Sequence, residues 1–250
     1  MTFETRPFVS EVRLLRERVP SFEEYPFTLP AIRNFRSVEL HPKVTFFVGE
    51  NGCGKSTLVE AIAVAFGLNP EGGSRSFAFS TRESHSSLSS CIRLIKGAQK
   101  PRDSFFLRAE SLFNLATEIE RLDEDPFGGP SIIDSYGGRS LHEQSHGESF
   151  FAVFRERFGA NAFYILDEPE AALSPMRQLS MLSLLHELVN ANSQFVIATH
   201  SPLLMAYPDS LLYQMSEDGI SPIEYRETEH FRIYREFLSN PERMLRILME

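Results

Sequence analysis

The chain lacks the features of a secreted or membrane-spanning protein. It has two cysteines, Cys53 and Cys91, among 250 residues, so the sequence offers no disulfide framework, and we expect a reducing, cytoplasmic environment. No apolar run approaches the roughly 20 residues that cross a bilayer, which predicts no membrane span. Residues 1–20 carry Arg and Glu throughout, a pattern unlike that of a signal peptide.

Basic charge is also scarce. The chain has 25 Lys and Arg against 34 Asp and Glu, a formal net charge of -9. This balance argues against a surface coated with cations for bulk nucleic-acid binding, although it leaves room for a local basic groove. Four cations cluster in the middle of the chain, and we interpret them as a solvated face: Arg93, Lys96, Lys100 and Arg102.

Three short apolar runs indicate a buried parallel sheet. They lie at 44–49, 162–168 and 194–200, and each is rich in β-branched or aromatic residues on consecutive positions. Residues 175–190 separate the second and third runs and predict a helix with Ser174 as its N-cap, hence a right-handed βαβ unit. The apolar residues that recur there at three-residue steps are expected to form the buried face: Met176, Leu179, Leu182, Leu185 and Leu188.

The remaining segments complete a single α/β domain over residues 1–250. Alternating residues at 8–15 and 31–40 predict strands of a more exposed, antiparallel sheet near the N-terminus. Runs rich in Ser and Gly at 71–90 and 123–140 predict loops. A smaller helical portion is expected as an insertion around 105–158.

The run "GENGCGKST" predicts a phosphate-binding loop, because it follows an apolar strand, precedes a helix and fits G-x-x-x-x-G-K-[ST]. Glycines let consecutive N–H groups turn toward phosphate oxygens, and the following helix adds its positive N-terminal end. Lys55 can reach the β- and γ-phosphates, the Ser56 hydroxyl can bind Mg²⁺, and Thr57 can donate to the α-phosphate. The backbone of the preceding residues completes the loop: Asn51, Gly52, Cys53 and Gly54.

Three polar residues follow the other two buried strands. Asp167 and Glu168 end the second run, and His200 ends the third, so all three are expected at the sheet edge where parallel sheets bind ligands. Asp167 is placed to hold Mg²⁺, and Glu168 is placed to polarise an attacking water, the two roles that phosphate hydrolysis needs. His200 beside them suggests a sensor of the γ-phosphate.

The combination of motifs resembles the ATPase domain of the ABC superfamily, most closely its soluble branch with the SMC proteins and RecF. The elements "GENGCGKST", "SHGES", "ILDEPEAAL" and "ATHSP" occur in that family's order and span most of residues 32–202. The resemblance implies a mostly parallel sheet flanked by helices, with Mg²⁺ and ATP bound. It also implies that Ser145, Gly147 and Glu148, in the signature position, grip the γ-phosphate of ATP on a second subunit.

The resemblance suggests further contacts on weaker matches. Glu110 stands where the family's glutamine is expected and could hold Mg²⁺ through water. Asn34 and Arg36 lie where repair-type heads touch the nucleotide, and Tyr25 is a weak candidate for stacking on the adenine. Ser174 replaces a common aspartate of the D-loop, a departure that puts in doubt how the two sites communicate.

The function that follows is a soluble ATPase that forms an ATP-dependent dimer and drives a separate partner, in DNA maintenance or antiphage defence. Two alternatives stay open: the motor subunit of a membrane transporter, and an ATP-gated binding switch with little turnover. A P-loop kinase or GTPase is disfavoured, since the sequence has neither an acceptor site nor the guanine-reading N-K-x-D.

Overall fold

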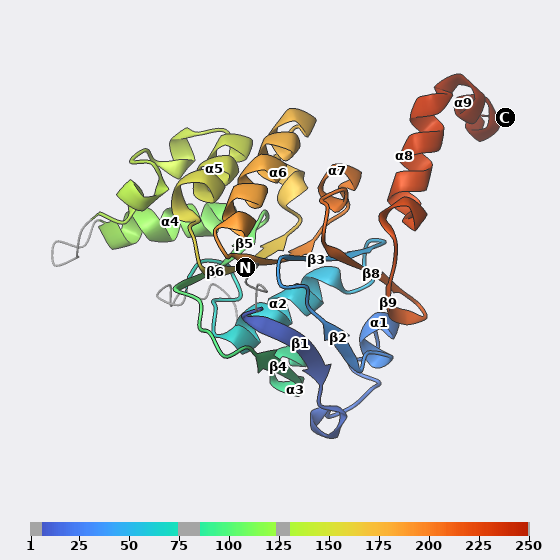
Figure 1. Ribbon diagram of the computed structural model, residues 1–250, viewed down its shortest axis with the longest axis horizontal. Coiled ribbons are helices and arrows are strands. Elements are labelled where there is room, and N and C mark those ends of the chain that lie inside the picture. Colours follow the sequence, from blue (N-terminus) through green and yellow to red (C-terminus); the bar gives the residue numbers. More distant parts are fainter. Residues whose placement is uncertain (1–6, 75–85, 124–130, 250) are drawn as a thin grey trace, which may run out of the picture.

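A six-stranded sheet forms the centre of the computed structural model, which describes residues 7–74, 86–123 and 131–249 (Figure 1). The strand order is β5-β6-β7-β3-β8-β9, and every pair is parallel except β8 with β9. The strands are β3 (Val44–Gly49), β5 (Asp103–Arg108), β6 (Ala162–Asp167), β7 (Gln194–Ala198), β8 (Leu211–Ser216) and β9 (Gly219–Pro222). The three predicted apolar runs are therefore adjacent strands, and the α/β class is confirmed.

A second, antiparallel sheet lies near the N-terminus, as predicted. Its strands are β1 (Val9–Leu14), β2 (Ser37–Glu39) and β4 (Ile92–Lys96), with β1 in the middle. The predicted strand at 31–40 is wrong in its first half, where Pro30–Arg33 form the short helix α1. Pro30 occupies the first helical turn, and its fixed φ favours a helix there over an extended strand.

Helices cover both faces of the six-stranded sheet. α2 (Lys55–Phe66) packs on one face, and α4 (Leu112–Asp123), α5 (His146–Ala152) and α6 (Pro175–Asn190) pack on the other (Figure 1). Alternate strand residues feed two separate cores. Phe46 and Phe105 belong to the core under α6, whereas Phe47 and Phe106 belong to the core under α2.

α6 confirms the predicted βαβ unit but not its predicted buried face. The Ser174 hydroxyl accepts from the Arg177 N–H, as an N-cap does. The buried residues are Met181, Leu185 and Val189, whereas Met176 and Leu179 are 72% and 45% exposed. A step of four residues stays closer to one helix face here than repeated steps of three, which drift around a helix of 3.6 residues per turn.

The helical portion starts later than predicted. Residues 105–108 belong to β5, which pairs with β6 and is buried on both faces, so the helices begin with α4. Residues 75–85 and 124–130 of the two predicted loops lie outside the described residues. The flanking parts contain α3 (Leu88–Cys91) and η2 (Ile133–Tyr136).

The remaining helices are short or peripheral. They are η1 (Arg16–Arg18), η3 (Leu141–Glu143), η4 (Val153–Arg157), η5 (Pro169–Ala172), α7 (Pro202–Met205), η6 (Tyr225–Glu227), α8 (Glu229–Ser239) and α9 (Pro241–Met249). α8 and α9 project away from the sheets (Figure 1). Within the described ranges, no helix is both long and apolar enough to cross a membrane.

Candidate functional site

The loop between β3 and α2 has the backbone of a phosphate site. Gly49 and Gly54 have φ values of +149° and +101°, and a Cβ at Gly49 would lie 2.4 Å from the Met215 carbonyl oxygen. No carbonyl of the described residues accepts from the N–H groups of Lys55, Ser56 or Thr57. These free donors open a twelve-residue helix, where an anion is favoured by both hydrogen bonding and the helix dipole.

Lys55 is folded back over this loop. Its side chain is buried, and Nζ donates to the carbonyl oxygens of Gly49 at 3.0 Å and Glu50 at 2.8 Å. Cys53 lies beside it, with Sγ 4.0 Å from Nζ. The ammonium group is therefore held at the mouth of the loop, within reach of an anion that occupies the free N–H groups.

A cavity of about 480 Å³ adjoins the start of α2. Its lining includes Tyr25, Ser56, Thr57 and Arg108, and the Tyr25 hydroxyl lies 2.9 Å from the Thr57 hydroxyl. Tyr25 therefore lies next to the phosphate loop. Its role toward adenine stays a prediction.

Asn34 and Arg36 follow α1 and have exposed side chains. Asn34 Nδ2 donates to the Glu217 carbonyl oxygen at 3.4 Å, toward β9. Within the described ranges, neither side chain makes a polar contact with the loop at 49–57. Their predicted contact with the nucleotide stays a prediction.

Asp167 ends β6 as a buried carboxylate, 4% exposed. Burial raises its pKa to about 6, against the opposing effects of the Arg108 guanidinium and a hydrogen bond from Ser56. Its Oδ1 atom is buried without a hydrogen-bond partner among the described residues. An orphaned carboxylate oxygen beside a serine hydroxyl suits Mg²⁺, which prefers oxygen ligands and usually takes only one or two from the protein.

Arg108 is a site residue that the sequence reasoning missed. From the end of β5, its Nε lies 3.2 Å from Asp167 Oδ2, and one of its terminal nitrogens lies 2.8 Å from Glu60 Oε2 on α2. The guanidinium therefore balances the negative charge of Asp167 and Glu60. Mg²⁺ bound to Asp167 would add further positive charge. A cation at the end of the buried run "SFFLR" was a visible signal, because such a residue needs a partner.

Glu110, two residues beyond Arg108, is exposed. Its negative charge helps to raise the pKa of Asp167, so it acts on the site electrostatically. Among the described residues, Glu110 makes no hydrogen bond or ion pair with Ser56 or Asp167. Its role as a metal ligand through water stays a prediction.

Glu168 and His200 face each other across the sheet edge. Glu168 adopts the left-handed region with φ +49°, which is uncommon for a residue other than glycine and typical of strained functional sites. Its Oε1 lies 3.6 Å from His200 Nε2. The predicted grouping of Asp167, Glu168 and His200 at the carboxyl ends of β6 and β7 is what the structure shows.

Two further residues hold His200 in place and escaped the sequence reasoning. Glu170 accepts from the His200 N–H and from the Thr199 hydroxyl, the latter at 2.7 Å. His230 of α8 places its Nε2 3.2 Å from His200 Nδ1. Burial lowers the pKa of both histidines, which favours neutral rings that share one hydrogen bond.

The signature turn, from Ser145 to Glu148, caps the start of α5. α5 packs on the face of the sheet opposite to α2 (Figure 1). The Ser145 N–H and hydroxyl donate to Glu148 Oε2 at 3.1 and 2.7 Å, and these bonds lower the pKa of Glu148. A Cβ at Gly147 would lie 2.5 Å from the Ala172 carbonyl oxygen. This close approach gives the glycine a packing reason within its own chain, in addition to any role toward a ligand.

Comparison with known proteins shows what this chain resembles. Residues 27–125 match the family model described as an AAA domain. A stretch of 73 residues is 41% identical to the chromosome partition protein Smc of Mycolicibacterium paratuberculosis (strain ATCC BAA-968 / K-10). That stretch is 29% of this chain and spans only 6% of the length of Smc.

One solved structure has a similar fold. A chain from an ABC transporter of the metal-chelate type, in an inward-facing conformation, aligns with a TM-score of 0.52 at 17% identity, over 92% of this chain and 88% of that one. The SMC head domain from Thermotoga maritima aligns at 18% identity with a TM-score of 0.41, over 75% and 93%. The comparisons therefore show similarity to an AAA domain over residues 27–125 and to the fold of an ABC transporter ATP-binding chain.

Proposed function

We propose that the chain binds and hydrolyses Mg²⁺-ATP between two copies arranged head to tail. The observation that carries this proposal is the phosphate loop, where three N–H groups meet no carbonyl of the described residues and the Lys55 ammonium contacts the loop backbone. Polyphosphate is the ligand that fits, because it accepts several charge-assisted hydrogen bonds at once. Asp167 and Ser56 lie beside that loop and would hold the metal ion.

The chain's own residues divide the chemistry. Mg²⁺, when bound, would neutralise charge on the phosphate oxygens. Glu168, half-exposed at the sheet edge, would orient a water molecule for attack on the γ-phosphate. His200 would donate a hydrogen bond from its Nε2 to the γ-phosphate. In this arrangement His230 Nε2–H donates to His200 Nδ1, so the proton of the neutral His200 ring is on Nε2.

A second copy supplies the missing side of the site. α5, which Ser145 caps, and α2 lie on opposite faces of the sheet, so the signature turn of one chain is not placed over its own phosphate loop (Figure 1). A head-to-tail pair would bring Ser145, Gly147 and Glu148 of each copy to the nucleotide of the other. The two sites would then assemble only when ATP fills them.

Glu168→Gln tests hydrolysis and assembly together. The variant should bind Mg²⁺-ATP as the unchanged protein does and release phosphate at least 100-fold more slowly, because amide oxygen is a poor base. Light scattering should show a dimer with ATP and a monomer with ADP. An unchanged chain that binds ATP yet releases no phosphate would instead favour the ATP-gated switch.

Ser145→Arg in the Glu168→Gln background should separate the ATP-trapped pair. The control is Ser90→Arg on α3, which makes the same exchange at another exposed serine and should leave the dimer intact. A mass that responds neither to nucleotide nor to Ser145→Arg would rule out the head-to-tail dimer. The signature turn would then be a helix cap.

The local identity to Smc supports a role in chromosome maintenance more than one in antiphage defence. We therefore propose that the ATP cycle drives a separate effector that acts on chromosomal DNA. Purification of the Glu168→Gln protein with ATP, followed by mass spectrometry of its partners, tests this role. The same result without ATP would argue against a nucleotide-controlled partner.

A further inference from the structure

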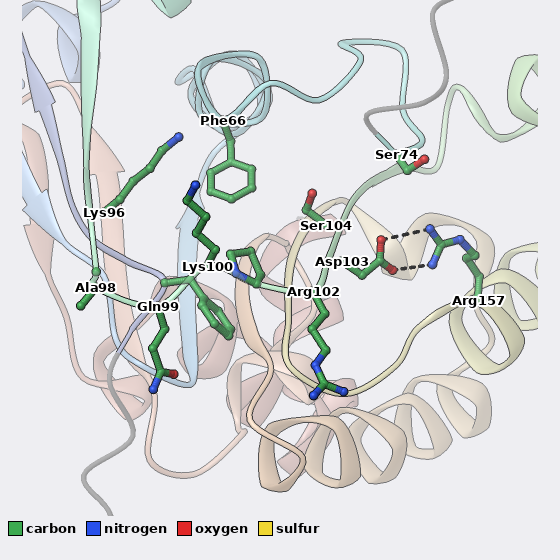
Figure 2. A pocket seen from close by; sticks show the side chains of 13 residues that line it. Phe66, Ser74, Lys96, Ala98, Gln99, Lys100, Arg102, Asp103, Ser104 and Arg157 are labelled. Carbon is green, nitrogen blue, oxygen red and sulfur yellow. Dashed lines mark hydrogen bonds and ion pairs between the residues drawn. The ribbon is translucent and has the colours of Figure 1, made fainter.

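A second pocket lies at the amino end of β5, whereas the phosphate loop follows the carboxyl end of β3. It has a volume of about 550 Å³, at the segment 96–104 that joins β4 to β5 (Figure 2). Cavities of this size bind small molecules. Its lining includes Phe8, Phe66, Ser74, Lys96, Lys100 and Ser104.

Two lysines in this pocket have no acidic partner among the described residues. Lys96 and Lys100 both reach toward the Phe66 ring, and Lys96 Nζ lies 4.8 Å from its centroid (Figure 2). Among the described residues, neither lysine makes an ion pair or a side-chain hydrogen bond. In a chain of net charge -9, two neighbouring ammonium groups produce a local field that favours an anion, because Asp103, the one carboxylate of the described residues that lines the pocket, is paired with Arg157.

The rest of the lining adds a donor and a fixed wall. The Ser104 side chain is on a residue only 6% exposed, and its hydroxyl has no hydrogen-bond partner in the described part of the chain. Arg157 and Asp103 form a two-pronged ion pair along one side, so their charges already balance (Figure 2). Arg102 also lines the pocket, but its side chain points away from Ser104 and the two lysines, so the lysines supply the unbalanced charge beside Ser104 (Figure 2).

We propose that this pocket binds a phosphate group through Lys96, Lys100 and Ser104. A phosphate carries up to two negative charges and several acceptor oxygens, so it can pair with two ammonium groups and one hydroxyl at once. A carboxylate carries a single charge and matches this set less well. The source is either a small phosphorylated molecule, for which the volume has room, or the backbone of a nucleic-acid strand that passes the pocket mouth.

Two elements connect this pocket to the phosphate loop. α2 runs from Lys55 to Phe66, and β5 runs from Asp103 to Arg108, so each has one end at either site. At the usual rise per residue, α2 is about 18 Å long and β5 about 20 Å. A phosphate bound between them lies outside the ATP site but on the same two rigid elements.

Titration calorimetry with inorganic pyrophosphate and with a short single-stranded oligonucleotide tests the site. Lys55→Ala serves as the background, because it removes phosphate binding at the first loop. Lys96→Ala and Lys100→Ala should each weaken binding of the small probe about tenfold, the loss typical of one charged hydrogen bond. The matched control is Arg93→Ala, which removes an exposed cation from the same strand outside the pocket and should change affinity less than about twofold.

The two probes separate the two sources. Binding of pyrophosphate that depends on both lysines supports a small phosphorylated ligand, and dependence seen with the oligonucleotide alone supports a nucleic-acid strand. The proposal is overturned if Lys96→Ala and Lys100→Ala bind both probes as tightly as their background does, or if Arg93→Ala weakens binding equally. Should Lys55→Ala fail to fold, the unchanged background serves, where the lysine variants should remove one of two pyrophosphate sites.

Discussion

Lys55 shows how one side chain carries the proposed ATP affinity. Lys55→Ala should abolish measurable ATP binding and leave the fold intact, because the variant loses the cation while the glycine backbone keeps its shape. Binding of a fluorescent ATP analogue, with circular dichroism for the fold, measures both. Lys43→Ala is the matched control, since Lys43 precedes the other end of β3 and its ammonium pairs with Asp209 at the surface. Unchanged ATP affinity in folded Lys55→Ala would remove this loop from the proposed site.

Asp167 makes stability depend on pH in an unusual direction. Its pKa rises from 3.8 to about 6 on folding, so the folded state holds a proton that the unfolded chain releases. Its contribution to stability is therefore largest below about pH 4 and is lost as the pH rises to about 6. At about 1.4 kcal/mol per pH unit, the ionised carboxylate costs about 3 kcal/mol above pH 6.

Asp167→Asn removes that cost, because an amide does not ionise. Its free energy of unfolding, relative to the unchanged chain, should increase by about 3 kcal/mol between about pH 4 and pH 7. Urea unfolding without nucleotide measures the difference. His200 and His230 titrate in both proteins, so their contributions cancel. A difference that stays constant with pH would show that Arg108 compensates the charge completely.

At the scale of single elements, the strands and helices that could be predicted are those that a short stretch of sequence specifies. Consecutive apolar residues predicted β3, β6 and β7, and a serine followed by proline predicted the start of α6. The buried face of α6 was mispredicted, because the order of leucines does not say which side the sheet occupies. Contact with β6 and β7 decides that face.

The same limit applies within the candidate site. The phosphate loop, Asp167, Glu168 and His200 could be predicted, since each lies at the end of a strand with a readable pattern. Arg108 and His230 could not be placed beside them, because their partners are 59 and 30 residues away along the chain. Only the sheet order and the return of α8 bring these residues together.

The contact between α5 and η5 gives a test of the signature turn. Gly147→Ala should lower the free energy of unfolding by about 1–3 kcal/mol even without ATP, because its Cβ would meet the Ala172 carbonyl oxygen. Gly159→Ala is the control, as a Cβ there meets nothing within 4 Å. Thermal and urea unfolding measure both variants. Equal stability of the two would mean that the glycine serves a ligand alone.

Across the whole molecule, negative charge should limit contact with DNA. With a net charge of -9, the isolated chain should bind duplex DNA weakly and with a steep dependence on salt. The ATP-bound pair should bind more tightly, because two copies present their cations to the same duplex. Fluorescence anisotropy at several salt concentrations, with ATP and with ADP, measures this. Tight binding without nucleotide at physiological salt would contradict the expectation.

The hydrogen bond between His200 and His230 makes the projecting helices a mechanical arm. α8 is fixed near its first turn, where Thr228 caps the helix and His230 meets His200, while its far end carries the exposed Leu238. An eleven-residue helix is about 16 Å long, so a tilt of about 10° at its base moves the tip by about 3 Å. A shift of His200 as the γ-phosphate arrives or leaves would thus produce a larger displacement at the free end of the arm.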